Sequence, residues 1–140
     1  MKTYVLGFLF DKYMCDILLM EKKRGPAHII GKLNGVGGSV EKGEAPLEAM
    51  IREGIEESGL TLEWKCFGLL KTKFGDVYLY ACASNDIYNF KQLEDEYLRR
   101  YLVNEVKMYE AAENLCWMIP MAIGCLKGDF HNEKFTIEEG

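Results

Sequence analysis

The sequence predicts an α/β protein, an α/β/α sandwich around a central mixed β-sheet. Two observations support this class. Apolar, β-rich runs occur at 3–10, 15–21, 60–73 and 77–83. A charged helix is predicted between the second and third runs, and an apolar helix at 115–127 follows the last. At 140 residues, 49% of them hydrophobic, the chain fits a single domain spanning 1–140.

The β-rich runs are predicted to form two hairpins. A turn-like segment at 11–14 joins the first two runs, and Gly75 with Asp76 joins the last two. Residues 84–100 are polar and acidic, which indicates a loop or short helix. The polar residues 129–140 are expected to form a loosely held tail.

The charged helix has clear local boundaries. Pro46 suits a first helical turn and Gly59 a C-terminal stop, so a helix of roughly thirteen residues is expected. Apolar residues recur within it at three- and four-residue spacings and predict a packed stripe, made of Leu47, Met50, Ile51 and Ile55.

Another sector of this helix carries Arg52 and three glutamates. Glu53 stands three residues before Glu56 and four before Glu57, so the carboxylates occupy neighbouring positions. Their repulsion costs a few tenths of a kcal/mol per pair, so folding alone does not explain the cluster. Hard oxygen ligands on a rigid element favour Mg²⁺ or Mn²⁺, and magnesium usually shares its coordination shell with substrate phosphates. The alternative interpretation is a solvated acidic helix.

The stretch from Gly38 to Leu60 resembles the Nudix box, G-x5-E-x7-R-E-U-x-E-E-x-G-U, where U is an aliphatic residue. The matching positions are Gly38, Glu44, Arg52, Glu53, Glu56, Glu57, Gly59 and Leu60. One position departs, because Gly54 stands where the family places a bulky aliphatic residue. Glycine inside a helix costs about 1 kcal/mol relative to alanine, so Gly54 indicates either tight packing against a neighbour or a slightly weakened box.

On these residues the chain is identified as a member of the Nudix hydrolase family, of the MutT-like kind. The resemblance implies the Nudix-type sandwich over nearly the whole chain and Mg²⁺-dependent hydrolysis of a nucleoside diphosphate derivative, with Mn²⁺ as an alternative metal. The implied metal ligands are the Gly38 carbonyl, Glu53, Glu56 and Glu57. Arg52 is expected to orient these carboxylates, with Glu44 as its partner.

The resemblance also implies a further carboxylate from later in the chain. Residues 104–113 resemble the late family strand, so Glu105 is the candidate, with Glu94 and Glu96 as competitors. Either Glu53 or Glu105 is then expected to be the general base.

Three residues are candidates for substrate contacts. Asn34 precedes Gly35 in a segment that resembles the one with which MutT-type enzymes bind oxidised purines, and its amide can donate and accept hydrogen bonds, although the pair also suits a simple turn. Lys23 lies in a basic cluster that contacts phosphates or belongs to a solvated loop. Trp117 floors a base pocket, as Met118 also can, or packs in the core.

Three function classes stay open. The leading one is a pyrophosphatase that converts a nucleoside triphosphate, with oxidised purines as candidates, to monophosphate and pyrophosphate. The second is the same chemistry on ADP-ribose, a dinucleotide or a nucleotide sugar. The third is a catalytically idle domain that senses a nucleotide.

Composition narrows the partners. The net charge of −5 argues against nucleic-acid polymers and membrane surfaces, which leaves a small nucleotide as partner and a homodimer as an open question. The five cysteines are scattered without a C-x-x-C pair, which favours neither a disulfide framework nor a zinc site. With no signal-peptide pattern at the start, we expect a cytoplasmic location.

Overall fold

The computed structural model describes residues 2–25, 27–130 and 133–139. Within these ranges the chain forms one sheet of eight strands and two α-helices. The strands are β1 (Lys2–Phe10), β2 (Asp16–Glu21), β3 (Leu33–Asn34), β4 (Val36–Ser39), β5 (Lys65–Thr72), β6 (Gly75–Ala83), β7 (Tyr97–Leu102) and β8 (Phe135–Glu138). The helices are α1 (Pro46–Ser58) and α2 (Leu115–Leu126), with short 3₁₀ helices η1 (Asn85–Asn89), η2 (Val103–Glu105) and η3 (Met108–Glu110).

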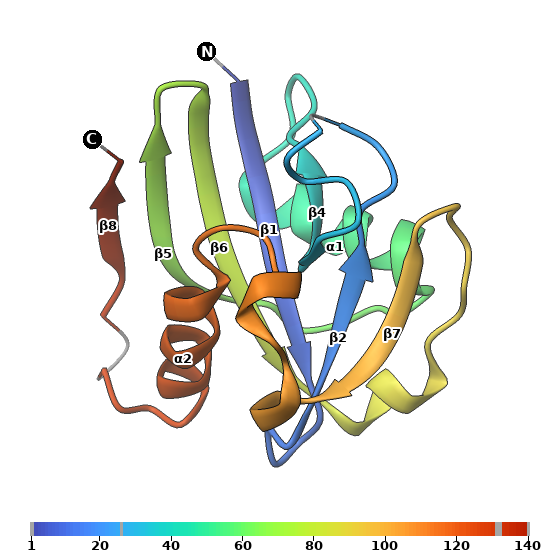
Figure 1. The fold of residues 1–140 in the computed structure, drawn as a ribbon. Coiled ribbons are helices and arrows are strands. Elements are labelled where there is room, and N and C mark those ends of the chain that lie inside the picture. Colours follow the sequence, from blue (N-terminus) through green and yellow to red (C-terminus); the bar gives the residue numbers. More distant parts are fainter. Residues whose placement is uncertain (1, 26, 131–132, 140) are drawn as a thin grey trace.

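The sheet is mixed, as predicted. Its order is β3-β2-β1-β6-β5-β8, with β4 also paired to β1 and β7 to β2. The pairs β1–β6 and β5–β8 are parallel, and the other pairs are antiparallel. Helix α2 covers one face of the sheet and α1 the other (Figure 1). The predicted α/β/α sandwich is therefore confirmed.

Alternation along the strands divides the core into two layers. Phe8 and Phe10 point toward α2, while Val5 and Leu9 of the same strand point toward α1. The α2 layer includes Ile17, Leu19, Phe67, Leu79, Met118, Ile119 and Ala122. The α1 layer includes Leu18, Met20, Met50, Leu62, Trp64 and Tyr80.

Both predicted hairpins are present. In the first, Leu9 pairs with Leu18 and Phe10 with Ile17. In the second, β5 and β6 are antiparallel, but Gly75 and Asp76 belong to β6 and the turn lies before them. None of the helices in the described ranges is long and apolar enough to cross a membrane.

Helix α1 has the boundaries that its sequence predicts. It spans 13 residues, beginning at Pro46, and Gly59 follows it with a positive φ of 75°. The Ala45 N–H donates to Glu48 Oε1 at 2.9 Å and supports the first turn. The Gly59 N–H donates to the Ile55 carbonyl at 2.9 Å and closes the last turn.

The predicted apolar stripe of α1 is wrong in two of its four members. Met50 is buried, and Ile51 is partly buried and packs against the same core layer, but Leu47 is 45% exposed and Ile55 42% exposed. The buried residues of the helix are Ala49, Met50, Gly54, Glu57 and Ser58. Three of these five residues, Ala49, Gly54 and Ser58, are small, and small side chains let the helix approach the sheet closely.

The later strands also differ from expectation. A loop or short helix was expected throughout 84–100, but residues 97–102 form β7 along β2. The strand expected within 104–113 is replaced by η2 and η3. In the tail expected to be loose, Phe135–Glu138 form β8 along β5, whereas residues 131, 132 and 140 lie outside the described ranges. These strands pair over long sequence distances, which local composition does not reveal.

Candidate active site

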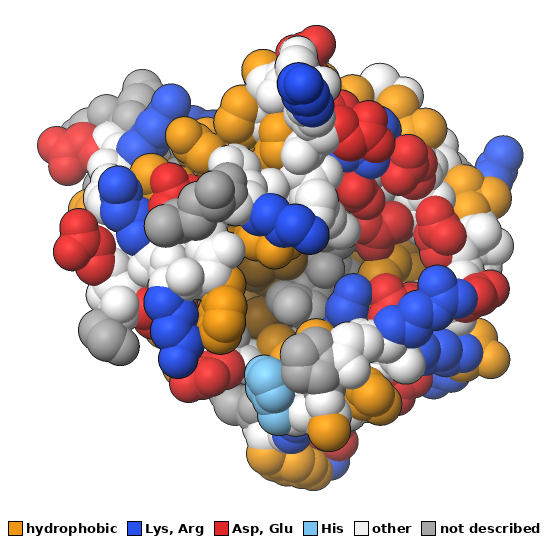
Figure 2. Space-filling model, turned by 90° about the horizontal axis from the view of Figure 1, so that it is seen from above, with side chains coloured by type: hydrophobic (Ala, Val, Ile, Leu, Met, Phe, Trp, Pro, Cys, Tyr) orange, Lys and Arg blue, Asp and Glu red, His pale blue; other side chains and the backbone are white. Residues whose placement is uncertain are grey.

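An acidic pocket lies where α1 meets two loops. It encloses about 150 Å³ and is lined by Arg24, Glu53, Glu57, Glu94, Asp95 and Glu96. Figure 2 shows acidic side chains gathered on one side of a hollow, next to Lys and Arg side chains. The pocket therefore brings carboxylates of the predicted box together with a later acidic segment.

Glu57 is the buried member of this pocket. Its side chain is 8% exposed, and Oε1 accepts a hydrogen bond from the Gly37 N–H at 3.2 Å. Burial, and then the hydrogen bond and charge of Glu53, raise the pKa of Glu57 to about 9, while the Gly37 N–H and Lys22 act in the opposite direction. The positive charge around Glu57 therefore does not offset its burial beside Glu53.

Glu53 lies against the backbone of Gly38. A Cβ on residue 38 would overlap the Glu53 carboxylate, so only glycine allows this approach. Three predicted metal ligands, Gly38, Glu53 and Glu57, are thus brought together by β4 and α1. Glu56 faces outward, with 47% of its side chain exposed, and reaches Glu53 only through Arg52.

Arg52 connects these carboxylates to the preceding loop. Its Nε and Nη2 donate to the two Glu44 oxygens at 2.8 and 3.0 Å, a two-point contact that only a guanidinium makes. Its Nη1 donates to Glu53 at 3.0 Å and to Glu56 at 3.3 Å. The Arg52 hydrogen bonds hold the pKa of Glu44 below its usual range, and these contacts raise the pKa of Arg52. The expected contact between Arg52 and Glu44 is therefore present.

The donors fit a divalent cation by their chemistry. They are hard oxygens, and the Glu53–Glu57 pair needs a counter-charge that a cation would supply. The site is not preassembled: in the part of the chain that the structure describes, no group of three or more His, Cys, Asp or Glu side chains is arranged to hold a metal. In this arrangement Glu53 and Glu56 each form an ion pair with Arg52.

Glu96 is the later carboxylate that the fold brings to the box. It accepts hydrogen bonds from Lys22 Nζ at 2.9 Å and from the Lys23 N–H at 2.6 Å. Burial raises its pKa, but the Lys22 and Lys23 hydrogen bonds outweigh burial and lower it overall. Arg24 and Asp95 form an ion pair beside it. Arg24 belongs to the basic cluster that the sequence indicates, whereas Asp95 was missed as a site residue, although the acidic run 94–96 was a signal.

The structure does not bring Glu105 to the box. In the β2–β7 register, Glu21 pairs with Tyr97 and Asp16 with Leu102. Glu96 and Glu105 therefore lie beyond opposite ends of β7, and that strand alone separates its ends by roughly 17 Å. The expectation that Glu105 joins the box acids is corrected in favour of its competitors Glu94 and Glu96, which line the pocket.

The three substrate candidates lie on different elements. Asn34 ends β3, and its Oδ1 accepts from the Gly35 N–H at 2.9 Å, as a turn residue would. Lys23 is exposed, with Nζ 3.6 Å from the centre of the Tyr97 ring. Trp117 packs partly buried against the core, and its Nε1 donates to Asn114 at 3.0 Å.

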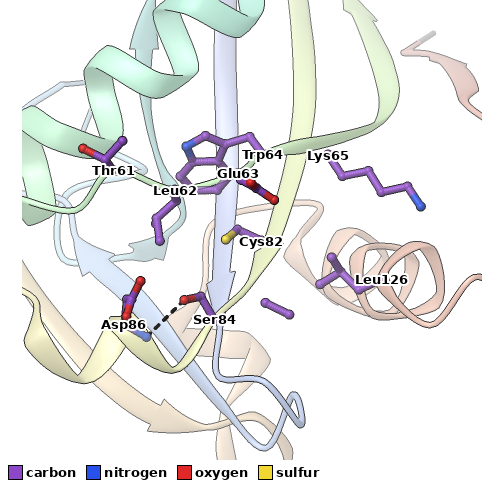
Figure 3. Close-up of a pocket in the computed structure, with 10 residues that line it drawn as sticks. Thr61, Leu62, Glu63, Trp64, Lys65, Cys82, Ser84, Asp86 and Leu126 are labelled. Atoms are coloured by element: carbon purple, nitrogen blue, oxygen red, sulfur yellow. Dashed lines mark hydrogen bonds between the residues drawn. The ribbon is translucent and has the colours of Figure 1, made fainter.

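A larger cavity lies elsewhere. It measures about 690 Å³ and is lined by the segment 61–65, by Cys82, Ala83, Ser84 and Asp86, and by Leu126 (Figure 3). None of the box acids lines it. We therefore place the candidate active site at the smaller acidic pocket, because the carboxylates are there.

Comparison with known proteins supports the box and the fold. The family model "NUDIX domain" matches residues 3–137. A 47-residue stretch is 51% identical to an oxidized purine nucleoside triphosphate hydrolase of Danio rerio, covering 34% of this chain and 29% of that protein. A 63-residue stretch is 33% identical to the 8-oxo-dGTP diphosphatase of Escherichia coli K12, covering 44% of this chain and 49% of that one. The matches thus span less than half of either relative.

Solved structures show the same fold. A MutT NUDIX hydrolase from Burkholderia pseudomallei superposes with a TM-score of 0.70 at 19% identity, over 86% of this chain and 96% of that one. A MutT protein from Bacillus halodurans gives 0.69 at 18% identity, over 99% and 90%. At such identities the likeness concerns the arrangement of helices and strands.

Proposed function

The chain belongs to the Nudix hydrolase family of nucleotide pyrophosphatases, and on that premise we propose that it hydrolyses a nucleoside triphosphate to monophosphate and pyrophosphate. The proposal includes an oxidised purine as the base, Mg²⁺ as the metal, one catalytic domain over 1–140 and a cytoplasmic location. The observation that carries it is the pair of Glu53 and the buried Glu57 against the Gly37–Gly38 backbone. The names of the two partial relatives support the choice of substrate.

Each box residue has a distinct part in the proposed reaction. When bound, the cation neutralises the diphosphate and lowers the pKa of water. Glu57, Glu56 and the Gly38 carbonyl are proposed to hold it together with Glu53. Arg52 orients Glu53 and Glu56, and Glu44 fixes Arg52 through the two-point contact.

The proton of the attacking water goes to a carboxylate of the chain. The water oxygen forms a bond to phosphorus, the bridging P–O bond between the α- and β-phosphates breaks, and monophosphate and pyrophosphate are released. We assign the proton to Glu53, which lies at the Gly38 backbone. Glu96 is a poorer base because its pKa is lowered, so it is assigned to holding the cation in place of Glu105.

The substrate contacts complete the proposal. Asn34 uses Oδ1 for the Gly35 N–H, so its amide N–H₂ is the group assigned to the base. Lys23 is assigned to phosphate, which would draw its ammonium away from Tyr97. Trp117 would contact the base by its ring.

Product analysis tests this function. The protein is incubated with Mg²⁺ and 8-oxo-dGTP, dGTP, ADP-ribose, a dinucleoside polyphosphate or a nucleotide sugar, and products are separated by anion exchange. We expect monophosphate and pyrophosphate, with 8-oxo-dGTP turned over faster than dGTP. Turnover of only the other diphosphates would retain the chemistry and remove the role of Asn34. No turnover with Mg²⁺ or Mn²⁺ would favour the idle nucleotide sensor, and light scattering would test for a homodimer.

A further inference from the structure

Gly54 is the position that departs from the box pattern, and a side chain from outside the helix fills the space beside it. It is buried, and a Cβ at this position would lie 3.3 Å from Trp64 Cζ2 and 3.4 Å from Nε1. A bulky aliphatic side chain does not fit there while Trp64 keeps its place. Of the two expectations for Gly54, tight packing against a neighbour is therefore confirmed.

The other side of the indole meets a second glycine. A Cβ on Gly7 of β1 would lie 2.7 Å from Trp64 Cζ3 and 2.8 Å from Met50 Cε. The ring is 9% exposed and belongs to the core layer beneath α1. Figure 3 shows it extending from the 61–65 segment toward α1. Trp64 thus fills the space between a glycine of the strand and a glycine of the helix.

The position of this contact along α1 connects it to the acidic pocket. Gly54 directly follows Glu53 and precedes Glu57 by three residues, so Gly54 and Glu57 share the buried face. A shift of the helix at Gly54 would move Glu53 from Gly38 and Glu57 from the Gly37 N–H. Core packing transmits such shifts because interiors have few voids.

The indole nitrogen of Trp64 makes no hydrogen bond with the residues that the structure describes, so the ring contributes to this site through its packing. Trp64 Nε1 is buried and has no hydrogen-bond partner in the described part of the chain. A buried donor left unpaired is unfavourable, so the packing of the large ring must outweigh this cost.

We propose that Trp64 is a positioning residue for the box carboxylates. It supplies, from the segment after α1, the bulk that the box lacks at residue 54, and so sets the distance between α1 and β1. The inference rests on the proposed function for its effect on catalysis, but its effect on metal binding can be measured separately.

The test replaces the large side chain at residue 64 with a large side chain at residue 54 of the helix. Three variants are compared with the native chain, namely Trp64→Ala, Gly54→Leu and the double variant. Mn²⁺ binding without substrate is followed from the electron paramagnetic resonance of the free ion. We expect each single change to weaken Mn²⁺ binding by about tenfold or more, the range for residues that orient metal ligands. The double variant should recover most of the loss, because one side chain again fills the space.

Two further variants keep the result interpretable. Trp64→Phe removes the unpaired N–H and part of the ring, so it should lie between the native chain and Trp64→Ala, and it serves where Trp64→Ala does not fold. Ile119→Ala creates a cavity in the opposite core layer, and we expect its folded fraction to bind Mn²⁺ as the native chain does. Circular dichroism gives the folded fraction of every variant.

The outcomes separate the two proposals. If the native chain binds Mn²⁺ and folded Trp64→Phe or Trp64→Ala binds it with the same affinity, the positioning role is overturned and the proposed function still stands. Equal losses in Ile119→Ala would also overturn it, because the effect would then follow stability in general. A native chain that binds no Mn²⁺ would instead contradict the proposed function. In substrate assays, the positioning role predicts a fall in kcat with little change in KM.

Discussion

The two helices that cover the sheet are built on opposite principles. Helix α1 turns small residues and one carboxylate toward the sheet, namely Ala49, Gly54, Ser58 and Glu57, with Met50 as its large buried side chain. Helix α2 buries Leu115, Met118, Ile119, Ala122, Gly124 and Cys125, and carries Pro120 in its interior. One helix approaches the sheet closely and presents charge, while the other fills volume.

This difference separates stability from the chemistry of the box carboxylates by layer. The α2 layer contains the phenylalanines of β1 and β5 and no residue of the acidic pocket. Helix α1 carries the buried Glu57 and the partly buried Glu53, and Trp64 of the same core layer packs against its Gly54. Substitutions in the two layers should therefore have different effects, and four predictions test this.

The largest effect is expected from Glu57→Gln. Turnover should fall by about 100-fold or more, because loss of a proposed ligand should exceed the 10–100-fold that changes beyond the ligands cost. Stability without metal should be nearly unchanged, since glutamine still accepts from the Gly37 N–H and is neutral at pH 7, as Glu57 is with its pKa raised to about 9. Steady-state kinetics and thermal unfolding measure both. Glu48→Gln, exposed on the same helix, is the matched control, and full activity in Glu57→Gln would contradict the assignment.

In the opposite layer, Ile119→Ala should destabilise the fold by about 2–5 kcal/mol through the cavity it leaves. Activity per folded molecule should be nearly native. Urea unfolding gives the loss of stability, and Ile123→Ala, a partly buried position on the same helix, should lose less. A fall in kcat that exceeds the loss of folded protein would show that the two layers are not separable.

Local signals explain why α1 was predicted better than its surroundings. The signals that indicate α1 all lie within the 16 residues 44–59. They are Pro46, Gly59 and the spacing of Glu44 and Arg52, so a local pattern is enough to predict them. Strands β7 and β8 depend on pairing with β2 and β5, which no local pattern encodes. The error over Glu105 has the same origin, because the end of β7 that meets the pocket depends on its register with β2.

A smaller effect is expected from Arg52→Lys. Lysine keeps the charge but loses the two-point contact with Glu44 and cannot also reach Glu53 and Glu56. We expect turnover to fall by about tenfold and the Mg²⁺ concentration needed for half-maximal activity to rise. Titration of activity with Mg²⁺ checks this, with Arg99→Lys on the exposed side of β7 as control. Unchanged Mg²⁺ dependence would remove the orienting role of Arg52.

The smallest effect concerns pH and Glu96. Its pKa is lowered in the fold, so its contribution to stability is present above the ordinary glutamate pKa and is lost as pH falls through the lowered value. Glu96→Gln should therefore cost about 0.2–1 kcal/mol at neutral pH, typical of an ion pair near the surface, and less in acid. Unfolding of both proteins between neutral and acidic pH measures this difference, and Glu94→Gln on the same loop is the control. If the stability difference between the native chain and Glu96→Gln grew as the pH fell, the predicted pH dependence would be wrong in sign.

The long parallel pairing of β1 and β6 has a consequence for the order of folding. Residues 2–10 pair over their whole length with residues 75–83, and everything between them, including α1, lies inside the loop that this pairing closes. Contacts between such distant segments form slowly, because chain entropy is lost before they are made. Helix α1 can begin to form from its own end signals, but Gly7 and Trp64 confine it only once the central strands have paired. A refolding chain should therefore gain helical signal before it gains affinity for metal.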